Sequence, residues 1–445
     1  MNAVIALVVY LATIIVWNFV LRRNIGEAML LGLLVVTAFS GADAWHVLVD
    51  ASHEAMQEEI MFAGLAFVVM SYVLGQTPVL GRLIDLLNSL LGRLKGGPVY
   101  TSTVAAGAFG SVAHIGAAVT AAVGSVTVPW MKRAGVRPEI AGSVVAGCAG
   151  MGVTFPFSGT MFILTGALAA SGTLTTAQLA VPLAIGGMYC LGVRLVVNWW
   201  IVRKHGVAPM DPADLLPVRQ SFRRGWSTLT LFAGMVVPVL LTLGWTGARV
   251  SDYAGVDTSE ALSLIVWIPV LMIAIVAVLG RKHLPRTGRA WFELGAGSAP
   301  KIGVIGVTIF AAFAASNVLN ALGLPAQLTE ALSHVDAPRP IMALVVGLIV
   351  VAVAIPLTAS ATMAAIGPVA VFALMGVGVD PVVAAVAVLI FASTEGASPP
   401  AGAPIYVAAG LAQADPAKMF RPLVTYFCLP IMATGIAIAS GVLPV

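Results

Sequence analysis

Gly-Val-Arg-Pro at residues 135–138 returns as Gly-Val-Asp-Pro at residues 378–381, and this internal repeat decides the fold. The two stretches lie 243 positions apart (138 to 381), and the same offset aligns further residues without a gap. These pairs include Ala141 with Ala384, Pro156 with Pro399 and Gly159 with Gly402. In each copy, a stretch rich in small residues precedes an apolar helix that is broken at proline. In a membrane such breaks expose half-helix termini to a ligand, so the repeat predicts a transporter.

The composition requires a membrane environment. The chain has 445 residues, of which 59% are hydrophobic and 9% charged, and its mean hydropathy is +1.00. A water-soluble globule cannot bury that much apolar surface, whereas apolar runs of about 17–25 residues can cross the bilayer as helices. The cysteines Cys148, Cys190 and Cys428 lack the paired spacing of a disulfide framework or a metal site. We therefore expect an all-α polytopic protein embedded in the lipid bilayer.

The basic residues predict the orientation of the spans. If the first span ends inside at Arg22 and Arg23, the inside loops contain 20 of the 23 Lys and Arg residues. The exceptions are Arg194, which lies within a span, and Arg249 and Arg339, which lie outside. This bias follows the positive-inside rule. The net charge of +4 therefore reflects membrane topology and does not indicate nucleic-acid binding.

The same orientation requires two re-entrant hairpins of opposite direction. Residues 99–131 are flanked by inside loops, so this segment enters and leaves the membrane from the inner face. Residues 341–370 are flanked by outside loops and enter from the other face. Each hairpin follows an amphipathic stretch, 80–95 or 325–338, of the kind that forms an interfacial arm. The predicted fold is an all-α polytopic membrane protein with an inverted repeat, two re-entrant hairpins and two broken helices.

Ten spans complete the predicted architecture. They are expected near residues 3–21, 27–42, 60–76, 139–170, 178–202, 226–247, 261–280, 302–322, 381–412 and 422–443, with polar connections at 203–225 and 281–301. The chain divides into five segments. These are scaffold helices and a first arm in 1–98, the first hairpin and broken helix in 99–170, scaffold helices, inner loops and a second arm in 171–340, the second hairpin and broken helix in 341–413, and a C-terminal span in 414–445.

The helix breaks carry the predicted chemistry. Gly-Val-Thr-Phe-Pro-Phe-Ser-Gly at 152–159 and Ala-Ser-Pro-Pro-Ala-Gly at 397–402 interrupt helices where the bilayer centre should be. Broken backbone at that depth must face protein or a wet cavity. Freed carbonyls and Thr or Ser hydroxyls are hard oxygen ligands that suit sodium, and half-helix N-termini suit a carboxylate. The alternative is a pair of ordinary proline kinks whose backbone groups are satisfied by neighbouring helices.

Ionisable residues at membrane depth are candidates for function. Glu395 is the only acidic residue in the interior of a predicted span, since Glu27 and Glu139 stand at the first position of theirs, so we expect it on the ion or substrate path. The alternative is a buried, protonated structural acid. His114 lies at the tip of the first hairpin, where it either titrates and contacts substrate or is satisfied by a backbone carbonyl. Arg194 lies about ten residues before the cytoplasmic end of its span, which favours a structural role in which the side chain snorkels or pairs internally.

Two runs of sequence resemble a known family. Val-Gly-Ser-Val-Thr-Val-Pro-Trp-Met-Lys-Arg-Ala-Gly-Val-Arg-Pro at 123–138 resembles the large membrane subunit of TRAP transporters, the tripartite ATP-independent periplasmic type. Thr-Glu-Gly-Ala-Ser-Pro-Pro-Ala-Gly-Ala-Pro at 394–404 is similar to the second helix break of that family. The resemblance implies a sodium-driven elevator symporter of the bacterial inner membrane, and no enzyme activity. It also implies two partners, a soluble periplasmic substrate-binding protein and a small four-helix membrane subunit.

In such a symporter, both hairpins and both breaks would enclose a small organic anion. The substrate residues expected here are His114, Gly116, Thr154, Ser158, Ser360 and Glu395. The sodium ligands expected here are Thr120, Gly124, Ser125, Thr154, Thr358, Thr362, Thr394, Ser398, Pro399 and Gly402. The chain departs from the family at His114, which replaces a glycine, and at Pro156-Phe157, where the family has two prolines. Thr358-Ala359 stands where the family often has an aspartate, so a proton is the alternative coupling ion.

Other classes of protein share parts of this pattern. A stand-alone dicarboxylate or citrate symporter of the same fold would differ only in needing no partners. An intramembrane enzyme would require paired catalytic groups, whereas Glu395 stands alone in the interior of the predicted spans. A purely structural scaffold would not require two matched helix breaks.

Overall fold

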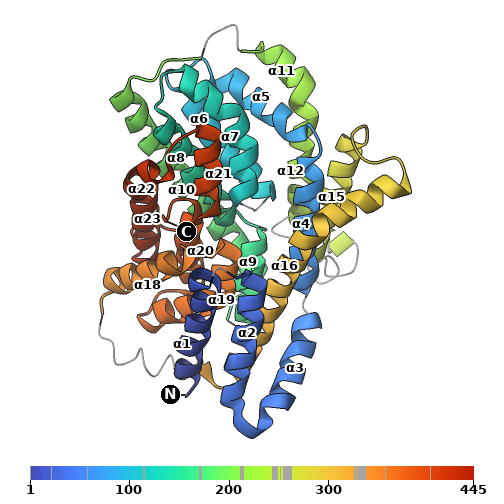
Figure 1. The fold of residues 1–445 in the computed structure, drawn as a ribbon, viewed down its shortest axis with the longest axis vertical. Coiled ribbons are helices and arrows are strands. Elements are labelled where there is room, and N and C mark those ends of the chain that lie inside the picture. The colour runs from blue at the N-terminus through green and yellow to red at the C-terminus, as the bar shows by residue number, and fades with distance from the viewer. Residues whose placement is uncertain are drawn as a thin grey trace.

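The computed structural model describes residues 2–21, 23–57, 59–113, 116–169, 173–210, 215–242, 249–250, 252–253, 263–324, 327, 337–355, 357–400 and 402–445. Within these ranges every regular element is a helix (Figure 1). Six helical stretches, some of them made of two consecutive helices, are long and apolar enough to cross a membrane, and a further pair, Pro138–Thr154 with Gly159–Leu168, is bent by 42° at a break. The all-helical, multi-span class that the sequence predicted is confirmed.

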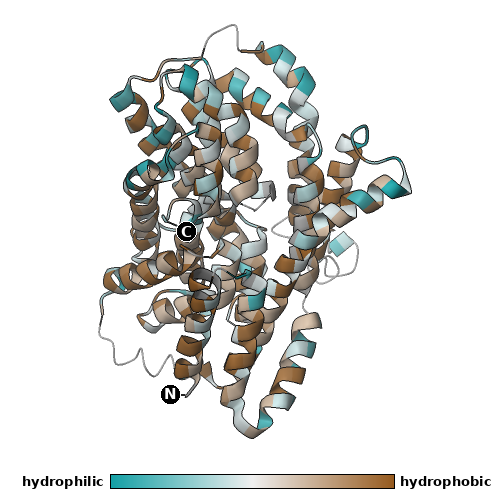
Figure 2. Ribbon diagram, viewed as in Figure 1, coloured by the Kyte–Doolittle hydropathy of each residue, from teal (hydrophilic) through white to brown (hydrophobic). Residues whose placement is uncertain are grey.

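Seven helices pack together in what we call the outer group. They are α1 (Asn2–Ile15), α2 (Ile25–Thr37), α3 (Ala44–Gln57), α4 (Glu59–Gly75), α12 (Thr230–Thr242), α15 (Leu264–Gly280) and α16 (Gly288–Ala321). Helix α16 packs against α2, α3 and α4, while α15 packs against α4 and α12. Hydrophobic residues dominate most of these helices, and many large apolar side chains on them are exposed, as a lipid-facing surface requires (Figure 2).

Helix α3 is an element of the outer group that the sequence analysis did not predict. The sequence analysis assigned no element between the spans at 27–42 and 60–76, but residues 44–57 are helical. The chain reverses before α3 at Gly41, whose φ of 62° lies in the left-handed region that glycine tolerates. The mixture of charged and apolar residues in α3 hid this helix from a search for long apolar runs.

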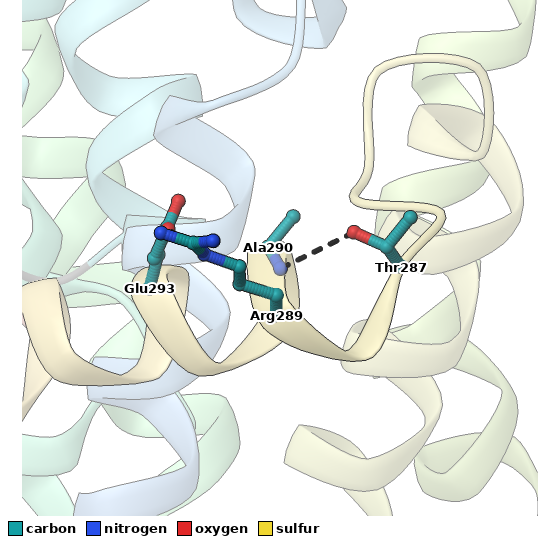
Figure 3. A network of polar contacts seen from close by, with 4 residues as sticks. All are labelled: Thr287, Arg289, Ala290 and Glu293. Atoms are coloured by element: carbon teal, nitrogen blue, oxygen red, sulfur yellow. Dashed lines mark hydrogen bonds and ion pairs between the residues drawn. The ribbon is translucent and has the colours of Figure 1, made fainter.

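The start of α16 is a second correction. The sequence predicted a basic loop at 281–301, whereas the helix begins directly after Thr287. The Thr287 hydroxyl accepts a hydrogen bond from the backbone N–H of Ala290 at 3.3 Å, and Arg289 pairs with Glu293 at 3.2 Å one turn further on (Figure 3). A capped, charged first turn therefore precedes the apolar part of the helix, which is why the charges gave the appearance of a loop.

The two sequence repeats form equivalent sets of helices. The first set is α6 (Gly97–Ala113), α7 (Gly116–Arg133), α8 (Pro138–Ala149), η3 (Gly150–Thr154) and α9 (Gly159–Ala169). The second set is α18 (Arg339–Ala354), α19 (Ala359–Gly376), α20 (Pro381–Ala392), η6 (Ser393–Gly396) and α21 (Ala403–Ala412). Each set is a helix pair followed by a helix that breaks after a short 3-10 turn, at the positions that the repeat predicted.

The second helix of each pair joins the two repeats. Helix α7 packs against α8 of its own repeat and against α21 of the other, and α19 packs against α20 and α9 in the same way. The 3-10 turns η3 and η6 also contact each other. Elements of each repeat pack around the other's break, and every residue of η3 and η6 is buried.

Three further helices complete what we call the repeat block. They are α10 (Thr176–His205), α22 (Pro416–Leu423) and α23 (Leu429–Ala439), with α10 and α23 both packed against α20. The arm predicted at 80–95 is α5 (Val79–Leu91), which packs against α6 and α11 (Val218–Gly225). The second predicted arm, 325–338, lies almost entirely outside the described residues. The division of the chain into scaffold segments and moving segments stays a prediction, because packing alone does not show movement.

Two glycines allow the breaks to approach each other closely. A Cβ atom on Gly150 would lie 2.0 Å from the backbone oxygen of Ser393, and a Cβ atom on Gly396 would lie 2.3 Å from the backbone oxygen of Ala146. Both obstacles are backbone atoms, which cannot turn away as the end of a flexible side chain can. The contact between the two breaks therefore requires glycine at both positions.

We predict that Gly150→Ala lowers the free energy of unfolding by about 1–3 kcal/mol, the usual cost of overpacking, because the added methyl group pushes η3 away from η6. Gly159→Ala is the matched control, since a Cβ atom there meets nothing within 4 Å. Thermal unfolding of each purified variant in detergent measures the effect. Equal unfolding midpoints for the two variants would contradict the close approach of the breaks.

Candidate functional site

Four helices begin beside one another where the two breaks meet. Helices α7 and α21 start together, because a Cβ atom on Gly116 would lie 3.2 Å from the ring of Pro404. Helices α9 and α19 also start together, where the hydroxyls of Thr160 and Ser360 are 3.1 Å apart. Each pair then packs side by side, α7 with α21 and α9 with α19 (Figure 1). Helix N-termini carry unpaired N–H groups and partial positive charge, so this centre favours anions.

The carboxylate of Glu395 joins the two pairs of helices. Its Oε2 atom accepts a hydrogen bond at 2.5 Å from the backbone N–H of Ala359, the first residue of α19. The carboxylate also accepts a hydrogen bond from the backbone N–H of Gly116, the first residue of α7. Glu395 lies in η6 and is only 7% exposed, so these bonds form away from bulk water. One side chain therefore caps the second helix of both helix pairs.

Gly116 and Glu395 were both predicted as substrate residues, from opposite repeats, and the structure brings them into contact. A Cβ atom on Gly116 would lie 2.3 Å from Oε1 of Glu395. Any larger residue at position 116 would thus displace the carboxylate from the backbone of α7. Glycine is the residue that permits this bridge.

The first break presents buried hydroxyls beside a strained residue. Ser158 accepts a hydrogen bond from the backbone N–H of Met161 at 3.1 Å and so caps α9, while Thr154 donates to the backbone oxygen of Met151 at 2.9 Å. Both predicted residues are fully buried. Phe157 between them has a φ of 61°, a left-handed conformation that is costly for a bulky residue. Such strain concentrates at functional sites and was not visible in the sequence.

The second break contains four of the predicted ligands. Thr394 donates to the backbone oxygen of Phe391 at 2.7 Å, and the Ser398 hydroxyl lies 3.8 Å from the sulfur of Cys428. Pro399 follows directly, and Gly402 precedes α21. A Cβ atom on Gly402 would lie 2.4 Å from the backbone oxygen of Glu395, so the chain folds back tightly on the residue that caps α7 and α19.

The start of α19 holds three predicted residues. Thr358 caps the helix by accepting a hydrogen bond from Ala361 N at 3.3 Å, and Thr362 donates to the Thr358 backbone oxygen at 2.9 Å. Ser360 contacts Thr160 of the first repeat. The sequence analysis missed Thr160, although a hydroxyl in the first turn after a break was a signal that could have found it.

Other predicted residues lie further from this centre. The Thr120 hydroxyl donates to the backbone oxygen of Gly116 at 2.9 Å, one turn along α7. Gly124 lies a turn beyond, against side chains of α21 and α8. Ser125 is on the exposed face of α7, and its hydroxyl donates to a backbone oxygen of the same helix. His114 lies outside the described residues. The roles of these residues stay predictions.

The donor set suits sodium better than a transition metal. In the described part of the chain, no three His, Cys, Asp or Glu residues gather at one place. The hydroxyls of Thr154, Thr362 and Thr394 donate to backbone oxygens, and each hydroxyl oxygen keeps lone pairs that can bind a cation. Hydroxyl and carbonyl oxygens are the ligands that hard cations prefer. The residues present therefore fit a sodium ion by their chemistry.

The positively charged side chain of Arg194 is buried behind the first break. Arg194 of α10 is 1% exposed, and its Nε atom donates to the backbone oxygen of Gly147 at 3.2 Å. Gly147 lies in the last turn of α8, where backbone oxygens are unpaired and a positive charge is stabilising. These contacts agree with the structural role expected for Arg194.

Comparison with known proteins identifies the family. Residues 4–440 match the model of a family described as the DctM component of the tripartite ATP-independent periplasmic transporter. The chain belongs to the DctM family. It is a multi-pass permease of the bacterial inner membrane and not an enzyme, as the sequence predicted.

Several relatives are similar over most of this chain, and a solved structure has the same fold. The protein y4mL of Sinorhizobium fredii is 24% identical over 426 residues, which cover 94% of each chain. The isethionate TRAP transporter permease protein DctMQ of Oleidesulfovibrio alaskensis is 22% identical over 84% of this chain and 54% of its own length. The crystal structure of the Alcanivorax borkumensis YdaH transporter has the same fold, with a TM-score of 0.62, 15% identity and coverage of 90% of this chain and 88% of its own.

We predict that Glu395→Gln exposes the start of α7, α19 or both to solvent exchange. The neutral amide offers one acceptor oxygen in place of two charged ones, and hydrogen bonds to a charged group contribute about 1.5–3 kcal/mol each. Hydrogen–deuterium exchange of peptides that contain Gly116 and Ala359 measures the change. Glu139→Gln, which removes a half-exposed ion pair with Arg137, is the control. Unchanged exchange of both peptides in Glu395→Gln would contradict the bridge.

Proposed function

We propose that this chain is the substrate-translocating subunit of a sodium-coupled symporter that imports a small organic anion. Its partners are a periplasmic substrate-binding protein and a small four-helix membrane subunit, as the tripartite family description suggests. The substrate is a carboxylate or a similar anion such as a sulfonate. One relative is named as a permease for isethionate, which is a sulfonate.

The meeting of four helix N-termini at Glu395 is the observation that carries this proposal. Each N-terminus carries roughly half a positive charge, so the four together supply about two. Ionised Glu395 supplies one negative charge. The remaining positive potential suits one anionic group of a substrate, and burial strengthens that attraction relative to water.

The proposed movement is an elevator in which the repeat block slides against the outer group. In this proposal the pairs α6–α7 and α18–α19 are re-entrant hairpins that enter the membrane from opposite faces. The contacts between the two groups support it, because α9 and α19 supply much of them by packing against α4 and α16. Both of these helices begin at the site, so a displacement of the block would carry the bound substrate across the membrane.

In this proposal, sodium binds on the side of each break where the preceding helix ends, away from the helix N-termini. A cation is repelled by helix N-termini and attracted by C-terminal carbonyl groups. The 3-10 turns η3 and η6 extend the C-terminal ends of α8 and α20, and they carry Thr154 and Thr394. These hydroxyls, with Ser398 and nearby backbone oxygens, would hold the ion close enough to stabilise the bound anion.

A second candidate is a proton-coupled carrier that works without a binding protein. The observation that favours it is the position of Glu395. Protonation of this carboxylate would remove the charge that holds α7 and α19, so proton binding could release both hairpins. His114, which departs from the family pattern, is a further candidate for proton coupling.

We predict that proteoliposomes containing this chain and its small subunit accumulate an organic acid only with the binding protein and an inward sodium gradient. Glu395→Gln and Ser398→Ala should each lower the initial rate by about tenfold or more, because one removes the bridge and the other a proposed ion ligand. Thr425→Ala is the control, since this exposed hydroxyl bonds only to a backbone oxygen of its own helix turn. Uptake of labelled acids is the measurement.

Two outcomes of that experiment would contradict the proposal. Uptake without the binding protein would exclude the tripartite mechanism and support a stand-alone carrier. Uptake that follows a proton gradient and ignores sodium would exclude sodium coupling. Loss of proton-driven uptake in Glu395→Gln would then support the second candidate.

A further inference from the structure

A polar cavity of about 460 Å³ lies between the arm α5 and helix α11. It is lined by Arg82 and Asp85 of α5, by Ser221 and Arg224 of α11, and by Leu216. Residues three apart on a helix share a face, so each helix directs a matched pair of polar side chains toward the other. The volume lies within the range of about 300–1,000 Å³ that is typical of small-molecule sites. None of the predicted site residues lines this cavity.

Within the described residues, the charged side chains around the cavity form no ion pair and the Ser221 hydroxyl has no hydrogen-bond partner. Ser221 is 1% exposed, and its hydroxyl has no hydrogen-bond partner. Among the described ion pairs, none includes Arg82, Asp85 or Arg224. A buried hydroxyl without a partner costs free energy, and such groups normally bond to protein, water or a ligand. The missing partner of the Ser221 hydroxyl therefore indicates that a molecule binds in the cavity.

The charges are fixed around the cavity by close packing of the two helices. A Cβ atom on Gly225 would lie 3.0 Å from the backbone oxygen of Arg82, so α5 and α11 touch beside the cavity. Burial raises the pKa of the Asp85 carboxyl, and the Arg224 guanidinium opposes this by lowering it. The two groups thus influence each other across the cavity without forming an ion pair.

The combination of charges selects the kind of ligand. Two guanidinium groups and a hydroxyl donor match the oxygens of a phosphate. A carboxylate beside them would repel a simple phosphate but would accept hydrogen bonds from an ammonium group. Together they complement a molecule in which a phosphate and a primary ammonium lie a few bonds apart.

The surroundings indicate that the ligand is a membrane lipid. Phe222 and Trp226, next to the cavity residues in sequence, are 54% and 55% exposed. Exposed aromatic residues beside basic ones are typical of the membrane–water interface. The basic residues of α5 and α11 also belong to the loops predicted on the cytoplasmic side, where basic pockets bind lipid headgroups.

We propose that this cavity binds the phosphoethanolamine headgroup of a phospholipid in the inner leaflet. Arg82, Arg224 and Ser221 hold the phosphate, and Asp85 holds the ammonium group. The bound lipid ties the arm α5, which packs against α6 of the repeat block, to the membrane interface. The site is independent of the transported substrate and of the coupling ion.

Native mass spectrometry of the full chain in an uncharged maltoside detergent tests this site. We expect phosphatidylethanolamine to bind at least about fivefold more tightly than phosphatidylglycerol, which has no ammonium group. Combined Arg82→Gln and Arg224→Gln substitutions should weaken binding of phosphatidylethanolamine by about tenfold or more, because charge-assisted bonds to phosphate are lost. Asp85→Asn should remove the preference between the two lipids. Arg219→Gln, an exposed arginine of α11 outside the cavity lining, should change neither.

Two comparisons can overturn the proposal, one between lipids on the wild type and one between the wild type and the double arginine variant. Equal affinity for the two lipids would show that Asp85 does not bind the ammonium group. Equal lipid binding by the wild type and the double arginine variant would show that the cavity is not the site. Soluble phosphoethanolamine and inorganic phosphate distinguish the source of the phosphate, since displacement of the lipid by either at micromolar concentration would exclude a lipid site.

Discussion

The pair of backbone hydrogen bonds to Glu395 is the interaction on which the arrangement of the repeats depends. An unpaired N–H group costs several kcal/mol in the hydrocarbon region of a membrane, and a helix that starts there has several of them. The carboxylate accepts from Gly116 of one repeat and from Ala359 of the other, so it satisfies two helices at once. The same side chain sets the register between the repeats, because it can reach both helices only when their starts meet.

Close contact between the breaks follows from this constraint. Glu395 lies in η6, and η6 reaches the centre only because Gly150 and Gly396 leave room for neighbouring backbone. The exchange of partners, in which α7 packs on α21 and α19 on α9, then places four helix N-termini around one buried carboxylate. In the proposed mechanism this assembly binds the anion and moves as one body. The contacts that hold the two repeats together would therefore also form the transport site.

The sequence predicted the architecture because its signals are periodic and local. Proline and glycine at a constant offset located both breaks, and the apolar composition identified the membrane. The partners of Glu395 could not be predicted, because they are backbone N–H groups that any residue could supply. The contact of Ser360 with Thr160 depends on α9 and α19 lying together across the repeats, which no local pattern encodes. Helix α3 and the start of α16 were missed because each mixes charged residues with apolar ones and so does not read as a long apolar run.

Relative movement of the repeat block and the outer group is the central claim, and one cross-link tests it most directly. Asn320 of α16 and Val369 of α19 line the same small cavity between the two groups. A disulfide between cysteines at these positions would join the groups. The account predicts that oxidation of this pair stops uptake, that reduction restores it, and that neither single cysteine variant responds. Full uptake by the cross-linked protein would contradict the elevator movement.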